Sequence, residues 1–442
     1  MHQTSLNLFG GVSVRILILG GDLAAVYAVH WIRKVDPISK ITLICDTEFP
    51  GFIRSLLPYI ALGEVEPFLS IAFPKAFVEK IERVELVRVK KLGEISLSEG
   101  VLQAGDKEYV LESSDKVLIS TGVEALGVPK KFAERIGEIY PLEKIEEALL
   151  LAERVQELGE RTRIGVLGGF YGLDIAYKLA VLGHDVELFF DEKRSLYEVL
   201  DSDMIGLIRK ILPSNLLFKE MEWDKAADND IIIARGYAKP IIPRMEGIVV
   251  GEQGGVLVDE YMKAFRNAFA AGSVVECVEK STGISFSHLS DNLSIAQGII
   301  AALNIEGFNY QVKRFFPLYE ALLGEKLVFS AGFSSEILAK HGKKVVTARH
   351  HFYTGDVASR GEGNDVYVKV IADRVTRTIY GVQVICGKEY AHGLYQILAF
   401  LANNLLIDDV VLTPPLYFPF TTRLIDPFKA TCQGIWRKLL KK

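Results

Sequence analysis

The stretch Val14-Arg15-Ile16-Leu17-Ile18-Leu19, followed at once by Gly20-Gly21-Asp22, decides how this chain is expected to fold. It has the pattern of a buried strand that turns through glycine directly into a helix. The same pattern recurs as Ile164-Gly165-Val166-Leu167, followed by Gly168-Gly169 and then by Gly172. Glycines in such a turn leave room for backbone N–H groups and a helix N-terminus to approach a phosphate. The sequence therefore predicts two nucleotide-binding folds in one chain.

Length and charge limit the class of protein. A chain of 442 residues is too long for one hydrophobic core, so two or three domains are expected. The formal net charge of -5 argues against nucleic acid as the main partner. The longest apolar stretches, Ile295–Ile305 and Leu394–Ile407, are shorter than the ~20 residues of a membrane span. No signal peptide is evident either, so we expect no transmembrane segment.

The four cysteines are Cys45, Cys277, Cys386 and Cys432. No two of them have CxxC spacing, so neither a dithiol redox centre nor a zinc site is indicated. Free cysteines are typical of an intracellular protein, and we expect a cytoplasmic location.

The hydrophobic pattern changes along the chain. Residues 14–46 and 164–191 both read as strand, helix and strand, with the continuous apolar character of buried parallel sheets. After about residue 310 the chain alternates between apolar and polar residues, as in Val345–Tyr353 and Asp365–Ala372. This alternation predicts an α+β domain with an antiparallel sheet at the C-terminal end.

The first turn departs from the G-x-G-x-x-G pattern at one position. Gly20 keeps the tight-turn glycine, Asp22 replaces the second glycine, and Ala25 is an accepted third residue. The turn alone is compatible with a phosphate site or with an ordinary strand–helix turn. The acidic ribose partner that ends the second strand falls on Cys45, with Asp46 next to it. Asp46 either reaches a ribose or is a turn residue.

The second turn departs further. Counting back from Gly172 places Gly169 in the second glycine position and Leu167 in the first, whereas a one-residue deletion would place Gly168 first. The sequence leaves both alignments open. The ribose position falls on Phe190 with Asp191 next to it, which repeats the offset of the first unit.

The segment after Asp46 carries a specific resemblance. Phe52-Ile53-Arg54-Ser55-Leu56-Leu57-Pro58-Tyr59 strongly resembles the active-site helix of the NADH oxidase and coenzyme A-disulfide reductase branch of the pyridine nucleotide-disulfide oxidoreductases. Other segments resemble this family in the same order: Ser120-Thr121-Gly122, Gly169–Asp174, Leu200–Met204, Val256–Tyr261, Phe269–Ser273, Gln297-Gly298, Tyr417–Thr422 and Asp426-Pro427. The resemblance covers residues 14–434, nearly the whole chain.

The resemblance implies an α/β fold with two Rossmann-like domains and a C-terminal α+β dimerisation domain. The FAD-binding domain would comprise residues 14–123 and 246–310, the NAD(P)H-binding domain 140–245, and the dimerisation domain 311–442 of a homodimer. FAD would be the cofactor and NAD(P)H the less certain co-substrate. The implied FAD-binding residues are Gly20, Gly21, Asp22, Ala25, Asp46, Arg54, Ser55, Thr121, Gly122, Gly272 and Ser273. The implied NAD(P)H-binding residues are Gly168, Gly169, Gly172, Asp174 and Asp191, and the implied catalytic residues are Ser55 and Tyr417.

Four departures from the family pattern bear on the chemistry. Ser55 stands where the family has a redox cysteine, and an alcohol is not a useful redox nucleophile near neutral pH. Ser55 would instead donate a hydrogen bond near the flavin or cap a helix. Ser273 replaces an aspartate that binds the ribityl chain, so looser flavin binding is expected. Cys45 is the third departure, and Phe190 with Leu167 the fourth.

These observations favour an FAD-dependent NAD(P)H oxidoreductase that passes electrons directly from the flavin to oxygen, a quinone or a small redox protein. The alternative is a degenerate paralogue that keeps the fold as a binding or scaffolding subunit. A third reading keeps FAD but takes electrons from another donor. Arg33 and Lys34 match positions that contact coenzyme A phosphates in the coenzyme A-disulfide reductases, or they form a solvated helix end. The basic tail from Ile435 to Lys442 either contacts a membrane surface or is solvated.

Overall fold

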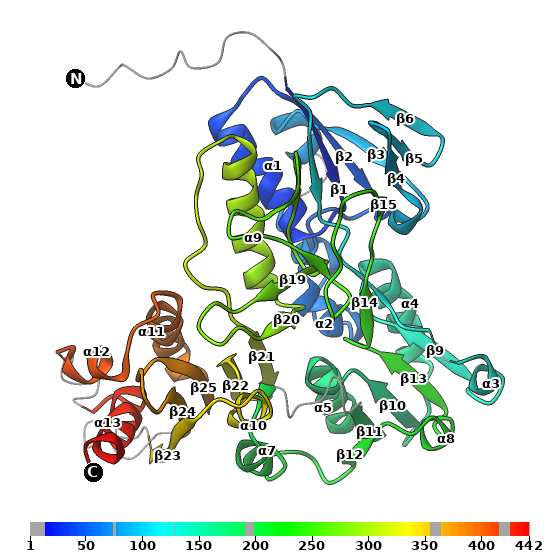
Figure 1. Cartoon of the computed structure of the whole chain (residues 1–442). Helices are drawn as coiled ribbons and strands as arrows, with labels where there is room; N and C mark the ends of the chain where they lie inside the picture. Colours follow the sequence, from blue (N-terminus) through cyan, green and yellow to red (C-terminus); the bar gives the residue numbers. More distant parts are fainter. Residues whose placement is uncertain are drawn as a thin grey trace.

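The structure is a computed structural model that describes residues 14–73, 77–127, 129–190, 199–353, 364–414 and 425–441. Asp191 and the segment Tyr417–Thr422, which the sequence analysis singled out, lie outside these ranges. Two mainly parallel sheets and one antiparallel sheet carry the architecture (Figure 1). The α/β fold class predicted from the sequence is confirmed.

The first glycine turn follows a central strand of the first sheet, whose order is β17-β18-β7-β1-β2-β3. Its strands are β1 (Arg15–Leu19), β2 (Lys40–Cys45), β3 (Glu85–Arg88), β7 (Lys116–Ile119), β17 (Lys263–Phe265) and β18 (Ala268–Ala270). β1 lies in parallel between β2 and β7, and β18 adds a further parallel strand beside β7. Two segments far apart in the sequence therefore complete one sheet.

Two long helices pack against each other on this sheet (Figure 1). They are α1 (Leu23–Val35) and α9 (Asp291–Ile305). Their close approach depends on Gly298, because a Cβ there would lie 2.3 Å from the backbone oxygen of Ala24.

The second sheet is wholly parallel, with the order β12-β11-β10-β13-β9. Its strands are β9 (Glu138–Pro141), β10 (Arg163–Leu167), β11 (Asp185–Phe190), β12 (Leu216–Glu220) and β13 (Ile231–Ala234). The helices of this region are α3 (Lys130–Ala133), α4 (Ile145–Gln156), η5 (Gly169–Gly172), α5 (Leu173–Val181), α7 (Ser202–Ile208) and α8 (Trp223–Ala226). β10 lies between β11 and β13 just as β1 lies between β2 and β7.

The C-terminal part forms an antiparallel sheet, as its alternating pattern predicts. The order is β21-β22-β25-β24-β23. The strands are β21 (Leu318–Leu323), β22 (Lys326–Gly332), β23 (Val345–Tyr353), β24 (Asp365–Asp373) and β25 (Ile379–Gly387). Helices around it are α10 (Ser335–Lys340), η6 (Lys388–Tyr390), α11 (Ala391–Ala402), α12 (Ile407–Leu412) and α13 (Pro427–Leu440). α13 packs on β23 and β24, so most of the basic tail belongs to a helix docked on the sheet.

Shorter elements connect these layers. The short strands are β4 (Ser96–Ser98), β5 (Val101–Ala104), β6 (Lys107–Val110), β8 (Val123–Ala125), β14 (Ala238–Pro240), β15 (Arg244–Met245), β16 (Val256–Leu257), β19 (Val275–Val278) and β20 (Ser285–Ser287). The short helices are η1 (Arg54–Leu56), α2 (Leu57–Ala61), η2 (Pro67–Ser70), η3 (Phe77–Ile81) and η4 (Leu92–Glu94).

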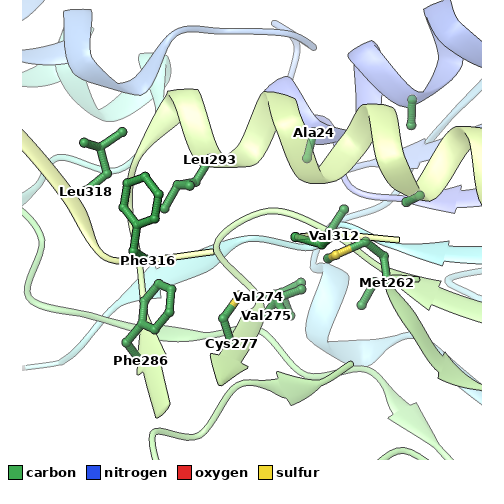
Figure 2. Close-up of a cluster of buried hydrophobic side chains, with 14 of the residues drawn as sticks. Ala24, Met262, Val274, Val275, Cys277, Phe286, Leu293, Val312, Phe316 and Leu318 are labelled. Atoms are coloured by element: carbon green, nitrogen blue, oxygen red, sulfur yellow. The ribbon is translucent and has the colours of Figure 1, made fainter. Parts of the chain in front are cut away.

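One hydrophobic core joins the first sheet to the C-terminal sheet. Figure 2 shows Leu293 of α9 together with Phe286 of β20, Phe316, which precedes β21, and Leu318 of β21. A second core fills the parallel sheet around β10 and includes residues of α2. Within the described ranges, no helix is both long enough and apolar enough to cross a membrane.

Candidate functional site

The two glycine turns have the same backbone geometry at their first residue. Gly20 directly follows β1 with φ of 129°, and Gly168 directly follows β10 with φ of 135°. A Cβ at Gly20 would lie 1.7 Å from the backbone oxygen of Ser120, and one at Gly168 would lie 1.5 Å from that of Arg235. Both turns thus need glycine for the same close approach to the neighbouring strand. Of the two alignments left open by the sequence, the geometry selects Gly168 as the first glycine.

The second turn is correspondingly one residue shorter than the usual spacing. A Cβ at Gly172 would lie 2.8 Å from a methyl carbon of Val166, so this residue permits close packing of the helix on the strand. That is the task of the third glycine in a dinucleotide-binding turn. Gly169, between the two, is buried and has φ of 56°.

Asp22 lies where the first turn, the end of β7 and the segment after β18 meet. It is the N-cap of α1, and its Oδ1 accepts hydrogen bonds from the Ala25 N–H at 3.3 Å and the Ser120 hydroxyl at 2.9 Å. Its Oδ2 would lie 3.6 Å from a Cβ at Gly122 and 3.2 Å from one at Gly272. Glycines that lie far apart in the sequence are therefore brought together around one carboxylate.

The pKa of the Asp22 carboxyl lies above its ordinary value. Burial raises the pKa of this carboxyl, and the nearby Arg54 guanidinium opposes that rise. The N-terminus of α1, a ready site for an anion, thus already faces a carboxylate of the chain itself.

The other predicted FAD-binding residues at this edge have defined partners. The Gly272 N–H donates to Gln297 Oε1 at 2.8 Å, which ties the turn after β18 to α9. The Thr121 hydroxyl donates to the Ile241 carbonyl at 2.5 Å. Ser273 is 2 % exposed and lines the cavity described below.

Successive side chains at the end of β2 point in alternate directions. Asp46 forms an ion pair of 2.7 Å with Lys144, at the start of α4. Cys45 and Thr47 point instead toward the glycine turn, each with a carbon atom 3.0 Å from a Cβ built at Gly21. Thr47, which sequence reasoning missed, is therefore the polar side chain closest to that turn at the end of β2. Its hydroxyl donates to Glu146 Oε1 at 3.0 Å.

Ser55 is exposed and lies in the middle of η1. Its backbone N–H donates to Asp291 Oδ2 at 2.8 Å, and that of Arg54 donates to Asp291 Oδ1 at 3.3 Å. Neither η1 nor α2 has a side-chain cap, so Ser55 does not act as a helix cap here. Asp291 is the first residue of α9 and joins that helix to the active-site helix of the predicted family.

The Arg54 side chain points away from solvent into a buried ionic cluster. It pairs with Glu143, whose Oε1 accepts the Gly236 N–H at 2.6 Å. Arg235 donates to the Arg54 carbonyl at 3.0 Å and lies 4.0 Å from the Glu143 carboxylate. The cluster joins the first sheet to the second. Glu143 and Arg235 were missed by sequence reasoning, although Arg235 directly follows a buried apolar strand.

The second turn offers fewer polar groups to a nucleotide. Phe190, at the ribose position, packs edge-to-face on Phe218 with ring centroids 5.0 Å apart. Asp174 lies in the first turn of α5, where burial raises the pKa of its carboxyl and the charge of Arg235 opposes the rise. Among the described residues, no group of His, Cys, Asp and Glu side chains could hold a metal ion.

The Arg33 side chain forms hydrogen bonds with backbone carbonyl groups of the same chain. Its guanidinium donates to the carbonyl oxygens of Glu82 at 2.6 Å, Asp36 at 3.2 Å and Arg83 at 3.3 Å. These contacts tie the end of α1 to the segment around Glu82.

A cavity of about 210 Å³ lies where the three main sheets meet. Phe170 and Tyr171 of the second turn form one wall, Ser273 and His288 another, and Tyr319 of β21 a third. The Tyr171 hydroxyl accepts the Leu289 N–H at 3.1 Å, and its ring lies 4.9 Å from that of Tyr319.

Known proteins resemble the chain over nearly its full length. No model of a protein family matches the sequence. The NADH oxidase of Methanocaldococcus jannaschii is 20% identical over 462 residues, which cover 97% of this chain and 100% of the relative. The NAD(P)H coenzyme A polysulfide/persulfide reductase of Pyrococcus horikoshii is 21% identical, over 93% of this chain and 96% of the relative.

Solved structures give the same picture of the fold. The water-forming NADH oxidase of Lactobacillus brevis bound to NADH has a TM-score of 0.82 at 16% identity, covering 97% of this chain and 99% of that one. An NAD-dependent persulfide reductase from A. fulgidus has a TM-score of 0.81 at 21% identity, covering 96% of this chain and 83% of that one. The resemblance predicted from the motifs is therefore confirmed, and the chain's homologues and structural neighbours are NADH oxidases, coenzyme A persulfide reductases and other pyridine nucleotide-disulfide oxidoreductases.

Proposed function

We propose that the chain is an FAD-dependent NAD(P)H oxidoreductase that passes electrons from the flavin to its acceptor without a thiol relay. The observation that carries the proposal is the convergence of Gly20, Gly122 and Gly272 around the N-terminus of α1. These residues come from three segments that the family resemblance assigns to FAD. Side chains at Gly122 and Gly272 would both face the Asp22 carboxylate, and one at Gly20 would meet the Ser120 backbone. The convergence supports a cradle for a dinucleotide.

The residues present fit FAD in part. The backbone of Gly20 and Gly21 and the α1 N-terminus would hold the pyrophosphate, and Ser273 would bind the ribityl chain. The Asp22 carboxylate near this N-terminus would weaken the hold on phosphate, because two anions would compete for one positive end. Bound flavin would supply the redox chemistry, taking a hydride from a nicotinamide and passing electrons on.

The cysteines give independent support for direct transfer from the flavin. All four are buried. Burial raises the pKa of Cys277 and of Cys386 to about 12, so neither is a thiolate at neutral pH. Because Ser55 supplies only a hydroxyl, the chain offers no accessible thiol to cycle between oxidation states.

The second sheet would position the nicotinamide cofactor. Gly168 and Gly172 keep the turn geometry that a dinucleotide needs, and relatives are named as NADH or NAD(P)H enzymes. The chain's own Asp174 would lie at this turn. NADH and NADPH are both candidates.

The test is an absorbance spectrum of the purified protein before and after anaerobic addition of NADH or NADPH. We expect flavin bands, native or acquired on incubation with FAD, that bleach with at least one nicotinamide. Protein that stays colourless after incubation with FAD would contradict the proposal. Flavin that neither nicotinamide bleaches would point to another electron donor.

The second candidate is a scaffolding paralogue. The structural contacts of Asp22 and Asp46 favour it. One carboxylate caps α1 and the other pairs with Lys144, so both have structural partners without a cofactor. Such a protein would gain no thermal stability from FAD, NADH or NADPH, whereas an enzyme would be stabilised by each ligand that it binds.

We also propose that residues 311–442 mediate homodimerisation. Large apolar side chains remain exposed on this part, including Tyr395 at 73 % and Leu412 at 70 % exposure. Size-exclusion chromatography with light scattering should give twice the mass of one chain, and a monomer at micromolar concentration would contradict the proposal.

A further inference from the structure

The first glycine turn lacks the acidic residue that normally ends the second strand of a dinucleotide-binding unit. That residue accepts a hydrogen bond from a hydroxyl of the adenosine ribose. Here the position is Cys45, which is fully buried and whose Cβ lies 3.0 Å from a Cβ built at Gly21. The neighbouring carboxylate, Asp46, pairs with Lys144 at 2.7 Å. An acid that faces this turn must therefore come from another part of the chain.

A carboxylate from the second sheet's domain reaches the end of β2. Glu146 lies in the first turn of α4. Its Oε1 accepts hydrogen bonds from the Thr47 hydroxyl and the Glu48 N–H, each at 3.0 Å. Thr47 is itself buried, and its methyl carbon lies 3.0 Å from a Cβ built at Gly21. The Glu146 carboxylate is thus held one side chain away from the first glycine turn.

The second oxygen of this carboxylate is buried and unpaired. Glu146 Oε2 has no hydrogen-bond partner among the described residues. The other glutamates at the start of α4 have partners within the chain. Glu143 pairs with Arg54. Glu147 Oε2 accepts the N–H groups of Glu143 and Lys144 at 2.7 Å and 3.0 Å. Because an unpaired buried carboxylate oxygen is costly, a ligand group that donates to Glu146 Oε2 gains free energy on binding.

The chemistry of this oxygen limits the ligand group that it suits. A carboxylate accepts hydrogen bonds and repels a phosphate, so the matching group is a neutral hydroxyl. A metal ion would need further ligands, and the part of the chain that the structure describes holds no group of His, Cys, Asp and Glu side chains to supply them.

We propose that Glu146 replaces the missing ribose acid, and that its Oε2 accepts a hydrogen bond from a hydroxyl of the adenosine ribose of FAD. The inference rests on the proposed function and adds to it a binding residue from the second sheet's domain. Thr47 and the Glu48 N–H are positioning groups, because they bind the other oxygen of the same carboxylate. The adenosine end of FAD would therefore contact both nucleotide-binding units.

The experiment titrates the full-length, flavin-free protein with FAD and with flavin 2′,3′-dideoxyadenine dinucleotide, which lacks both hydroxyls of the adenosine ribose. Flavin fluorescence gives the two dissociation constants. We expect the unmodified protein to bind FAD about tenfold more tightly than the analogue, because the analogue loses a hydrogen bond to a charged group. Glu146→Gln should weaken FAD binding by about fivefold, since an amide oxygen is a weaker acceptor than a carboxylate. The same variant should change the affinity for the analogue by less than about twofold, whereas a merely structural role would weaken both ligands equally.

Glu153→Gln is the matched control. Glu153 lies on the same helix, is exposed, and loses the same charge in the variant. This control should leave both dissociation constants unchanged. Circular dichroism and the unfolding temperature identify a Glu146→Gln variant that fails to fold, in which case Glu146→Asp replaces it. The aspartate keeps the charge but is one methylene shorter, so it too should weaken the binding of FAD and spare that of the analogue.

Three results would overturn the inference. They are equal affinity of the unmodified protein for FAD and the analogue, a folded Glu146 variant that binds FAD as tightly as the unmodified protein, and an equal loss of affinity for both ligands. Each of these results leaves flavin binding and bleaching by NAD(P)H, and therefore the proposed function, intact. A protein that binds neither flavin would instead contradict the proposed function, and this inference with it.

Discussion

At the scale of single residues, Ser55 and the cysteines determine which redox chemistry is open to the chain. Ser55 is exposed beside the N-terminus of α9, while the only thiols are buried in the sheets and helices. A thiol reagent should therefore find no target in the folded protein.

We predict that Ellman's reagent titrates no thiol in the native protein and all 4 cysteines after denaturation. Ser55→Cys should add one rapidly reacting thiol. Asp291→Asn in that background should speed the reaction at neutral pH, because the Asp291 carboxylate opposes formation of a thiolate beside it. Ser202→Cys, also at an exposed position, is the control whose reactivity should not respond to Asp291→Asn. A native thiol titrating in the unmodified chain would show that one of the cysteines is accessible.

The residue scale also marks the limit of sequence reasoning. The offset from Cys45 to Asp46 made Asp46 a candidate ribose partner, but its ion pair with Lys144 could not be read from the sequence. Thr47 was missed because its relation to the turn depends on how the chain bends after the strand. Arg54 was expected near FAD, but its partner Glu143 could not be inferred because they meet only through tertiary packing.

At the scale of elements, the glycine turns are the positions where a side chain is least tolerated. We predict that Gly168→Ala destabilises the protein by at least about 2 kcal/mol, because the new Cβ meets the Arg235 carbonyl and φ is positive. Gly206→Ala is the control: it lies inside α7 with nothing within 4 Å of a new Cβ. This substitution should stabilise by about 0.5–1 kcal/mol. Thermal unfolding measures the stability change of both variants. A Gly168→Ala variant as stable as the wild type would contradict the geometry of this turn.

A second prediction at the scale of elements concerns how stability depends on pH at the ends of α1 and α9. Burial raises the pKa of Glu306, the C-cap of α9, from 4.5 to about 7, and the charge of Asp36 adds to the rise while Arg33 and Lys116 oppose it. The protonated carboxyl is therefore favoured by folding, and its contribution is lost as pH rises through about 7. Glu306→Gln should match the wild-type unfolding temperature at pH 4 and exceed it at pH 8. Glu252→Gln, at an exposed position, should show no such pH-dependent gain. If Glu306→Gln differed from the wild type by the same unfolding temperature at both pH values, the raised pKa of Glu306 would be refuted.

Elements differ in how well the sequence predicts them. β1, β10 and β13 follow from continuous apolar runs, because strands buried on both faces leave an unmistakable signal. Short strands such as β4 and β15 do not, since three or fewer half-exposed residues carry no periodicity. The one-residue deletion in the second turn was also undecidable, because only backbone contacts with the next strand distinguish Gly168 from Leu167 as the first position.

At the scale of the whole molecule, buried ion pairs connect the layers. Arg314 and Glu279 pair at 2.6 Å between the C-terminal part and the first sheet's domain. Lys369 of β24 pairs with Asp201 at 2.6 Å near α7. The succession of two parallel-sheet units and a C-terminal antiparallel sheet could be predicted from hydrophobic patterns. These ion pairs could not, because burial of a charge depends on the relative placement of domains. The relative position of the two glycine turns, and hence of any two bound cofactors, depends on such contacts.

The cluster of Arg54, Glu143 and Arg235 tests this view of the interdomain contacts. Glu143→Gln should destabilise the protein by about 3–5 kcal/mol, because two buried guanidinium groups lose their shared counter-charge. Glu124→Gln, which breaks an exposed pair with Lys239, should cost no more than about 1 kcal/mol. Urea unfolding followed by circular dichroism gives both values. Limited proteolysis should also cut Glu143→Gln faster between the first and second sheets, since loss of the pair loosens one against the other. Equal urea midpoints for the two variants would show that the cluster does not hold the layers together.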